Sequence, residues 1–255
     1  MSKRNILITG GASGIGLGIA QHLGSLGHHI IIADINLTAA TKAVEQLHKQ
    51  NIGASAIELD VTNSKDVTDL PKNLHPLTVD VLINNAGIQH VSKLEDFPPE
   101  KWQLLINIML IAPAMLSQAL LPSMRKQNYG RIINIGSVHS VVASPYKSAY
   151  VAAKHGLLGF AKTLALETGD CDVTVNTLCP AYVKTPMVEN QIAAQAIENG
   201  ISEQEVMDNI MLAPMPKKAF IGIDELAATA AFLLTKEARN ITAQALVIDG
   251  GWTAR

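Results

Sequence analysis

Three side chains in the sequence have the types and spacing for acid–base chemistry: Ser137, Tyr150 and Lys154. Tyr150 and Lys154 are four residues apart, so a helix would place both on one face. A free tyrosine, with a pKa of about 10, is a poor base at neutral pH, but a neighbouring ammonium group favours its phenolate form. Ser137 follows a predicted strand and could hold a substrate oxygen beside Tyr150. The competing interpretation is an exposed tyrosine–lysine pair on a helix surface.

A glycine-rich turn near the N-terminus, residues 9–16, has the composition of a phosphate-binding loop. Glycines let the backbone turn tightly and approach a phosphate closely, and the following helix offers free N–H groups and a positive dipole end. The turn follows a predicted strand and precedes a predicted helix, which is the context of a dinucleotide site. The residues predicted to hold the pyrophosphate are Gly10, Ala12, Ser13, Gly14, Ile15 and Gly16.

Asp34 ends the second predicted strand. An acidic side chain at this point can bind both ribose hydroxyls of a dinucleotide, and it would repel the additional phosphate of NADP. Its alternative role is to cap the helix predicted over residues 38–50, but Asn36 is better placed to do so. Asp34 therefore predicts NAD as the cofactor.

The elements that must position these groups alternate regularly along the 255 residues. Short β-branched runs, several nearly all apolar, alternate with longer helical stretches, which indicates parallel strands covered on both faces. We predict an α/β fold, a Rossmann-like doubly wound sheet of seven parallel strands in a single domain, 1–255. The predicted strands are 6–9, 29–33, 54–59, 81–84, 131–135, 173–178 and 245–248. The predicted helices are 15–26, 38–50, 101–126, 149–167 and 224–234.

A long insertion, about residues 186–218, interrupts this alternation between the sixth and seventh strands. It shows helical patterns at 188–198 and 203–212. An insertion at the carboxyl end of a parallel strand usually forms a substrate site or a lid. We therefore predict a helical substrate lid, with a packed surface subdomain as the alternative.

The composition argues against several other classes of protein. The net charge of −2 gives no electrostatic reason to expect nucleic acid as a partner. Cys171 and Cys179 lack metal-ligand neighbours, so we expect reduced thiols and no metal. The N-terminus has no signal-peptide or transit pattern. Polar residues and a proline interrupt the most apolar stretch, 104–121, which we interpret as a buried helix rather than a membrane span. A cytoplasmic location is expected.

Four motifs resemble those of the classical short-chain dehydrogenases/reductases, in order and over essentially the whole chain: residues 9–16, 84–87, Ser137, and 150–154. The resemblance implies hydride transfer between a nicotinamide cofactor and an alcohol, with Ser137, Tyr150 and Lys154 as the catalytic residues. It also implies that Tyr150 and Lys154 lie against the cofactor, with Lys154 bound to the nicotinamide ribose. The other cofactor contacts that it implies are Asp60 and Val61 at the adenine, Asn84, Ala86 and Gly87 at the adenosine ribose, and Val183 and Thr185 at the nicotinamide amide.

Position 109 departs from the family pattern. In the family, an asparagine stands seven residues after the tryptophan that corresponds to Trp102. That asparagine lets a main-chain carbonyl hold a water molecule, and the water relays protons from the catalytic lysine. This chain has Met109 instead, and Asn107 would point to nearly the opposite side of a helix. Pro113 has no N–H, so it leaves the Met109 carbonyl free to bind a water and would preserve the relay. The alternative is that Met109 cripples the relay.

Within the family, four longer stretches resemble the bacterial 3-hydroxybutyrate dehydrogenases: residues 84–90, 130–135, 147–156 and 249–255. A carboxylate held in a closed site needs a cation and hydrogen-bond donors. The resemblance implies that Gln89, Ser137, His139, Lys147, Tyr150 and Gln191 contact the substrate, and that Tyr182 and Trp252 wall the pocket.

Each of these polar groups also has a simpler explanation. Lys147 could be a solvated surface lysine, Gln191 an exposed helix residue, and the His139 ring could bond a backbone carbonyl. His139 is two residues beyond Ser137, so both would face the same way on an extended chain. Ala181 and Tyr182 stand where this subgroup has glycine and tryptophan, which leaves the preferred chain length of the substrate open.

The function predicted from these residues is NAD-dependent, reversible oxidation of (R)-3-hydroxybutyrate to acetoacetate. A second interpretation keeps the machinery but changes the substrate to another small hydroxy acid or an uncharged alcohol. A third is a redox sensor that binds NAD without chemistry. Met109 supports it, but the intact Ser137, Tyr150 and Lys154 argue against it, since a sensor needs no base. The apolar helices predict a homo-oligomer, and the resemblance implies a tetramer.

Overall fold

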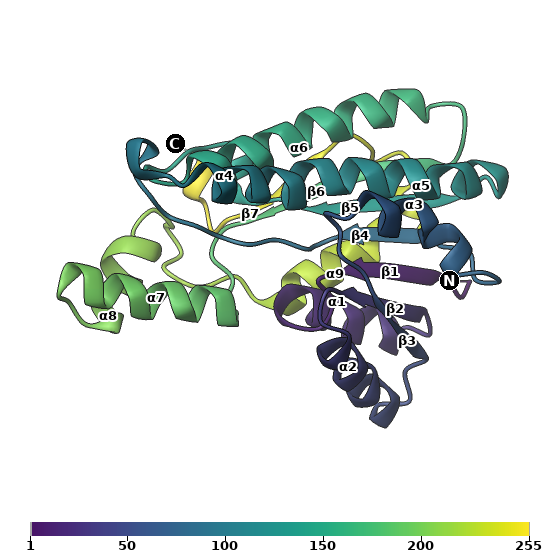
Figure 1. Ribbon diagram of the computed structural model, residues 1–255, viewed down its shortest axis with the longest axis horizontal. Coiled ribbons are helices and arrows are strands. Elements are labelled where there is room, and N and C mark those ends of the chain that lie inside the picture. The colour runs from purple at the N-terminus through teal and green to yellow at the C-terminus, as the bar shows by residue number, and fades with distance from the viewer. Residues whose placement is uncertain (1, 255) are drawn as a thin grey trace.

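Seven parallel strands form one sheet in this computed structural model, which describes residues 2–254 (Figure 1). Met1 and Arg255, the ends of the predicted domain, lie outside the described residues. The strands occur in the order β3-β2-β1-β4-β5-β6-β7, which confirms the predicted Rossmann-like doubly wound sheet. Their bounds are β1 (Asn5–Thr9), β2 (His29–Asp34), β3 (Ala54–Glu58), β4 (Val81–Asn84), β5 (Gly130–Ile135), β6 (Val173–Pro180) and β7 (Ala245–Ile248).

Helices cover both faces of the sheet. One face packs against α1 (Gly14–Ser25), α2 (Leu37–Lys49) and α9 (Ile223–Leu233), and the other against α3 (Ser64–Asn73), α5 (Ala112–Lys126) and α6 (Ser148–Glu167). Neighbouring residues of a strand enter opposite cores, as Ile6 and Leu7 do, because strand side chains alternate in direction. The two cores explain why the five inner strands are buried at nearly every position, whereas the edge strands β3 and β7 are partly exposed.

The helix predicted over residues 101–126 is divided into three parts. It consists of α4 (Pro99–Ile106), a wider π-helical turn (Asn107–Ile111) and α5, with the Ala112 N–H bonded to the Asn107 carbonyl. Pro113, in the first turn of α5, supplies no N–H to the carbonyls preceding it, so the regular four-residue ladder cannot continue there. The predicted helix is thus present as one continuous helical stretch, Pro99–Lys126, and the local π-helical turn within it was not predicted.

Helix α3 was not predicted. Its sequence is mostly polar and contains Pro71, and only Val67 and Leu70 are buried, so it lacks the strong apolar periodicity of the other helices. The Asn63 side chain caps its first turn by accepting hydrogen bonds from two backbone N–H groups.

Two further helices occupy the predicted insertion, α7 (Pro186–Asn199) and α8 (Glu203–Val206), followed by a π-helical turn (Met207–Met211). They project beside the carboxyl ends of β6 and β7 at one end of the molecule (Figure 1). The strand order reverses direction between β1 and β4, so the crossovers diverge there and leave a crevice at the carboxyl ends of the strands. The fold thus places the insertion beside the crevice where ligands bind in such sheets.

One helical stretch in the described part of the chain, Pro99–Lys126, is long and apolar enough to cross a membrane, and its most apolar 18-residue window has a mean hydropathy of 2.0. Only 39% of its most apolar window is buried, less than the sequence led us to expect, and Ile111 and Met115 are 44% and 40% exposed. The stretch packs against α3 and α6 and carries cavity residues on its inner side, as core helices of folded domains do.

Candidate active site

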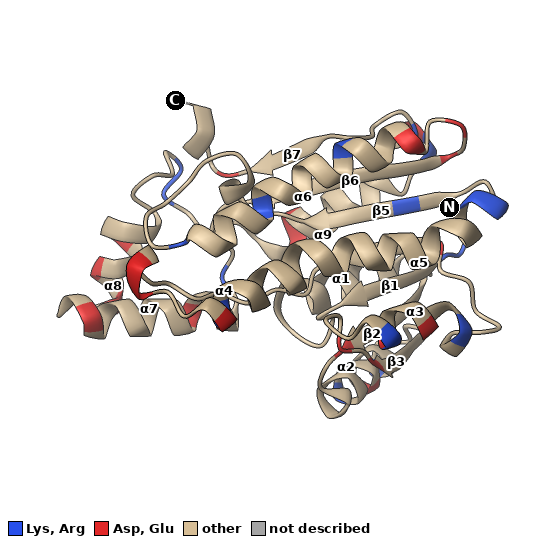
Figure 2. Ribbon diagram, turned by 45° about the horizontal axis from the view of Figure 1, so that its top comes forward, with Lys and Arg blue, Asp and Glu red and all other residues tan. Residues whose placement is uncertain are grey.

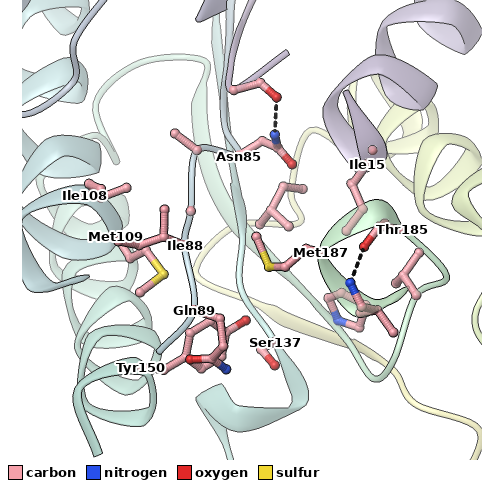
Figure 3. A pocket seen from close by; sticks show the side chains of 18 of the residues that line it. Ile15, Asn85, Ile88, Gln89, Ile108, Met109, Ser137, Tyr150, Thr185 and Met187 are labelled. Atoms are coloured by element: carbon pink, nitrogen blue, oxygen red, sulfur yellow. Dashed lines mark hydrogen bonds between the residues drawn. The ribbon is translucent and has the colours of Figure 1, made fainter. Parts of the chain in front are cut away.

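A single elongated cavity of about 400 Å³ runs along the carboxyl ends of the strands and brings most of the predicted residues together (Figure 3). The predicted cofactor residues that line it are Gly10, Ser13, Gly14, Ile15, Asp34, Asp60, Val61, Ala86, Gly87, Val183 and Thr185. Ser137, Tyr150 and Lys154 line it with the predicted substrate residues, namely Gln89, His139, Lys147, Tyr182, Gln191 and Trp252.

The glycine-rich turn has the shape that a dinucleotide requires. Gly10 and Gly14 have positive φ values of 58° and 53°, a conformation that side chains disfavour. A Cβ at Gly16 would lie 2.6 Å from Nδ2 of Asn85, so this position also excludes a side chain. The first N–H groups of α1 follow directly, as in a pyrophosphate site. The turn therefore fits the cofactor that the sequence predicts.

Asn85 belongs to the 84–87 motif, which the resemblance placed under the adenosine ribose, and it fixes this turn from the end of β4. Its Nδ2 donates to the carbonyls of Thr9 and Gly10, both at 2.9 Å. Ala12, Gly16 and Asn84 do not line the cavity, in contrast to the other predicted cofactor residues. They contact residues beside the cavity instead: the Ala12 N–H donates to Asp34, and the buried Asn84 side chain donates to the Asn134 side chain. The Asn-Asn-Ala-Gly motif was the signal that could have identified the role of Asn85.

The Asp34 carboxylate is held in place at the end of β2. Its Oδ2 accepts from the Ala12 N–H at 3.2 Å, and its Oδ1 accepts from the Asn36 N–H at 3.1 Å. The Asn36 side chain accepts from the Ala39 N–H and caps α2, which confirms that Asp34 is not the cap. Asp34 therefore presents a fixed negative charge to the cavity.

Tyr150 and Lys154 face the cavity from α6, so the interpretation as an exposed pair is wrong. Lys154 is 4% exposed; its Nζ donates to the Ile135 carbonyl at 2.6 Å and lies 5.6 Å from the centre of the Tyr150 ring. Burial lowers the pKa of Lys154 to about 8 and raises the pKa of Tyr150, while a hydrogen bond with the Ser137 side chain opposes the rise. The ionisation of Tyr150 therefore depends on the neighbouring Ser137 and Lys154 side chains.

Ser137 and His139 lie close together as predicted, but because of a turn in the chain and not because the chain is extended. The chain does not stay extended after β5: Ser137 caps a short 3-10 turn, and its Oγ accepts from the His139 N–H at 3.1 Å. The imidazole Nδ1 lies 3.4 Å from the same Oγ, and Nε2 lies 2.7 Å from Oγ of Ser144 rather than at a backbone carbonyl. Burial and the charge of Lys147 lower the pKa of His139 to about 4, so the ring is neutral at neutral pH.

Lys147 is buried, not solvated on the surface: it is 7% exposed. Its Nζ donates to the Tyr182 hydroxyl at 3.2 Å, and burial lowers its pKa. The Tyr182 ring stacks on Trp252 at 5.9 Å between ring centres, and Trp252 meets His139 edge-on at 5.7 Å. Among residues 2–254, no carboxylate forms a salt bridge with Lys147. The cavity thus holds an uncompensated cation close to its aromatic wall.

Met109 reaches the cavity, and Asn107 does not. Met109 is 1% exposed, and its sulfur would lie 3.5 Å from a Cβ placed on Gly87. Asn107 accepts from the Gln103 side chain at 2.9 Å on the outer side of the helix, which confirms that it cannot replace the missing asparagine. Gln89, Ser137 and Tyr150 gather at one end of the cavity in Figure 3, and Met109 lies to the side of Tyr150.

Further apolar side chains that the sequence analysis missed line the cavity, among them Ile35, Leu59, Ile88, Ile108, Met187 and Val188. Ile35, Leu59 and Ile88 follow strand ends, Ile108 lies in the π-helical turn, and Met187 and Val188 begin α7. Nothing in their residue types separates them from core residues. A position after a strand end was the only available signal, and only the first three have it.

Residues 4–196 match the short chain dehydrogenase family. Two D-beta-hydroxybutyrate dehydrogenases are similar over nearly their full length: that of Rhizobium meliloti (strain 1021) is 41% identical and covers 99% of both chains, and that of Cupriavidus necator is 40% identical and covers 100% of both. A crystal structure of an actinorhodin polyketide ketoreductase variant with NADPH has a TM-score of 0.94 and 29% identity, covering 99% of this chain and 98% of that chain. Because the family match spans well over half of its residues, this chain belongs to the short chain dehydrogenase family.

Proposed function

We propose that this oxidoreductase catalyses the reversible, NAD-dependent oxidation of (R)-3-hydroxybutyrate to acetoacetate. The observation that carries the proposal is the buried ammonium of Lys147, which lies in the same cavity as Tyr150 and has no carboxylate partner in residues 2–254. A buried cation without a counter-ion is costly, so a site that retains one is suited to an anionic ligand. The similarity to two D-beta-hydroxybutyrate dehydrogenases supports the same substrate.

The residues around Lys147 suit a carboxylate. Gln89, His139 and Gln191 line the same cavity as Lys147. The amide groups of Gln89 and Gln191 can donate hydrogen bonds, and the His139 ring lies between the Ser137 and Ser144 hydroxyls. Tyr182 and Trp252 close the pocket with apolar surface, which suits the methyl end of a short acid. The Tyr182 hydroxyl is itself bound to Lys147, so it narrows the pocket beside the cation.

Tyr150 acts as the general base in this proposal. Ser137 holds the substrate hydroxyl beside the Tyr150 oxygen, and Tyr150 removes the hydroxyl proton as the C3 hydride leaves. Because Lys154 keeps its proton below a pH of about 8, its charge favours the phenolate at neutral pH and offsets the effect of burial on Tyr150. The bound nicotinamide supplies the hydride acceptor. Val183 and Thr185, which line the cavity between β6 and α7, would hold the nicotinamide.

Initial rates test the proposed substrate. With NAD, we expect reduction of the cofactor by (R)-3-hydroxybutyrate to be at least about a hundredfold faster than by 2-butanol at equal concentration, because only the acid engages the buried cation. A faster rate with 2-butanol would support the uncharged-alcohol alternative and contradict the proposal. Binding of NAD without turnover of any alcohol would support the redox sensor.

Asp34 is proposed to select NAD over NADP. Replacing Asp34 by serine removes the fixed charge, so we expect the ratio of kcat/KM for NAD to that for NADP to fall by about a hundredfold. Glu58 on the neighbouring strand is exposed and outside the cavity, so Glu58→Gln serves as the matched loss of one negative charge. An unchanged ratio in Asp34→Ser, or an equal change in Glu58→Gln, would show that Asp34 is not the selector.

Pro113 is proposed to sustain the proton relay in place of the missing asparagine. Its lack of an N–H leaves carbonyls of the π-helical turn free to hold water near Lys154. We therefore expect Met109→Asn to change kcat by less than about threefold, whereas Pro113→Ala, which restores the N–H, lowers kcat by about tenfold or more. A large rise of kcat in Met109→Asn would contradict the proposal, because it would show that the relay is crippled in this chain.

We also propose that the chain forms a homo-oligomer, a tetramer by family resemblance. The exposed apolar side chains of the π-helical turn, α5 and α6, including Ile111, Met115 and Leu166, form the surface that a second copy would cover. A cytoplasmic location, and the absence of metal, nucleic acid and membrane as partners, stay predictions from the sequence.

A further inference from the structure

A second cavity, of about 360 Å³, lies at the amino ends of the strands, away from the active site. Figure 2 shows the basic segments at the N-terminus and at the start of β5 next to each other on this side of the sheet. Basic side chains from three parts of the chain line it: Arg4, Arg131, and the neighbouring Lys236 and Arg239. The reaction proposed above uses none of these residues.

His28 contributes an unused donor to this cavity. The ring is 3% exposed, and its Nδ1 accepts from the Arg4 N–H at 3.2 Å. Burial is the main cause that lowers the pKa of His28, so the ring is neutral at neutral pH. A neutral imidazole whose Nδ1 accepts must carry its proton on Nε2. This buried Nε2–H finds no hydrogen-bond partner in the described part of the chain.

Arg131 contributes a second unused donor. It is 2% exposed, and its Nη1 donates to the carbonyls of Gly130 and Asp172 and pairs with the Asp172 carboxylate at 3.0 Å. Its Nε–H has no partner within residues 2–254. Buried donors are almost always paired, so two orphans that line one cavity call for an acceptor inside it.

The charge around the cavity has the sign that an anion requires. Arg4 pairs with Asp80 and stacks 3.5 Å from the centre of the Tyr129 ring, and Arg131 pairs with Asp172. Lys236 and Arg239 are exposed at the rim, and no salt bridge engages either of them in the residues that the structure describes. Two buried donors beneath two free cations provide the groups that hold oxyanions in proteins.

We propose that this cavity is an anion site that binds a phosphate group, through the Arg131 Nε–H and the His28 Nε2–H at its floor and Lys236 and Arg239 at its rim. The phosphate can belong to inorganic phosphate or to a small phosphate monoester. Because the site lies at the amino ends of the strands and the cofactor cavity lies at their carboxyl ends, the phosphate binds independently of the cofactor.

The test is calorimetric titration of the full-length enzyme saturated with NAD, which blocks the pyrophosphate site in the active-site cavity. Inorganic phosphate and glycerol 3-phosphate are the two probes. We expect saturable binding of at least one of them. Tighter binding of the monoester would identify an organic phosphate as the natural ligand, and tighter binding of inorganic phosphate would identify the free anion.

Three variants locate the binding. His28→Asn keeps an acceptor for the Arg4 N–H but removes the Nε2 donor, and a Lys236→Gln, Arg239→Gln double variant removes the rim charges without altering the core. We expect each to weaken binding by about tenfold or more, whereas Lys42→Gln, an exposed lysine on α2, leaves it unchanged. No saturable binding to the NAD-saturated enzyme, or equal binding by all variants, would overturn the proposal and indicate water in the cavity. The readout is binding rather than turnover, so it is independent of the proposed hydroxy-acid reaction.

Discussion

Replacing Tyr150 by phenylalanine is expected to lower kcat for oxidation of (R)-3-hydroxybutyrate by about a thousandfold. The change removes only the oxygen that takes the substrate proton, and a positioned general base typically contributes about 10²–10⁴-fold to a rate. The phenylalanine ring keeps the edge-on packing against His139, at 6.1 Å between ring centres, so the cavity keeps its shape. Steady-state production of NADH measures the effect.

The control for this variant is cofactor binding. The glycine-rich turn and Asp34 are unaltered, so the dissociation constant for NADH, measured by fluorescence, should change by less than about threefold. A variant that binds NADH normally but retains more than about a tenth of the wild-type kcat would show that Tyr150 is not the base.

Replacing Lys147 by methionine is expected to lower kcat/KM for (R)-3-hydroxybutyrate by about two to three orders of magnitude, mostly through KM. Removing one partner of a buried charge pair typically costs about 2–5 kcal/mol, and here the other partner is the proposed carboxylate. The rate with 2-butanol should not fall, since an uncharged alcohol makes no use of the ammonium. Initial rates with both alcohols measure the difference.

The same substitution makes a prediction about stability. Because burial lowers the pKa of Lys147 and no salt bridge engages it in residues 2–254, methionine should leave the Tm unchanged or raise it. Lys162 is an exposed lysine on α6, the helix that Lys147 precedes, so Lys162→Met is the matched control. This control should leave the rates with both alcohols unchanged. If Lys147→Met slows both alcohols equally, its effect is structural and the carboxylate assignment is wrong.

The sequence was most informative where a conformation depends on a few neighbouring residues. The glycine-rich turn, the Asp34 and Asn36 pair, and the four-residue spacing of Tyr150 and Lys154 each impose local geometry, and the structure has that geometry. Apolar or β-branched runs identified all seven strands. The five inner strands are buried on both faces and need such runs, whereas the edge strands β3 and β7 are partly exposed.

The sequence was less informative where several segments decide the conformation together. The turn after Ser137 depends on its capping hydroxyl and on Ser140, which a strand pattern does not indicate. The π-helical turn arises from Pro113 within an otherwise regular helical pattern. The link between Lys147 and Tyr182 joins residues 35 apart, so only the fold reveals it. The cavity at the amino ends of the strands likewise gathers residues with no common motif.

Transfer of isotope from the substrate tests the central claim most directly. The enzyme is incubated with NAD and (R)-3-hydroxybutyrate carrying deuterium at C3, and the reduced cofactor is analysed by mass spectrometry. The account predicts that NADH acquires the deuterium while acetoacetate forms in equal amount, because the C3 hydride moves directly to the nicotinamide. Reduced cofactor without deuterium, or bound NAD with no acetoacetate formed, would contradict it.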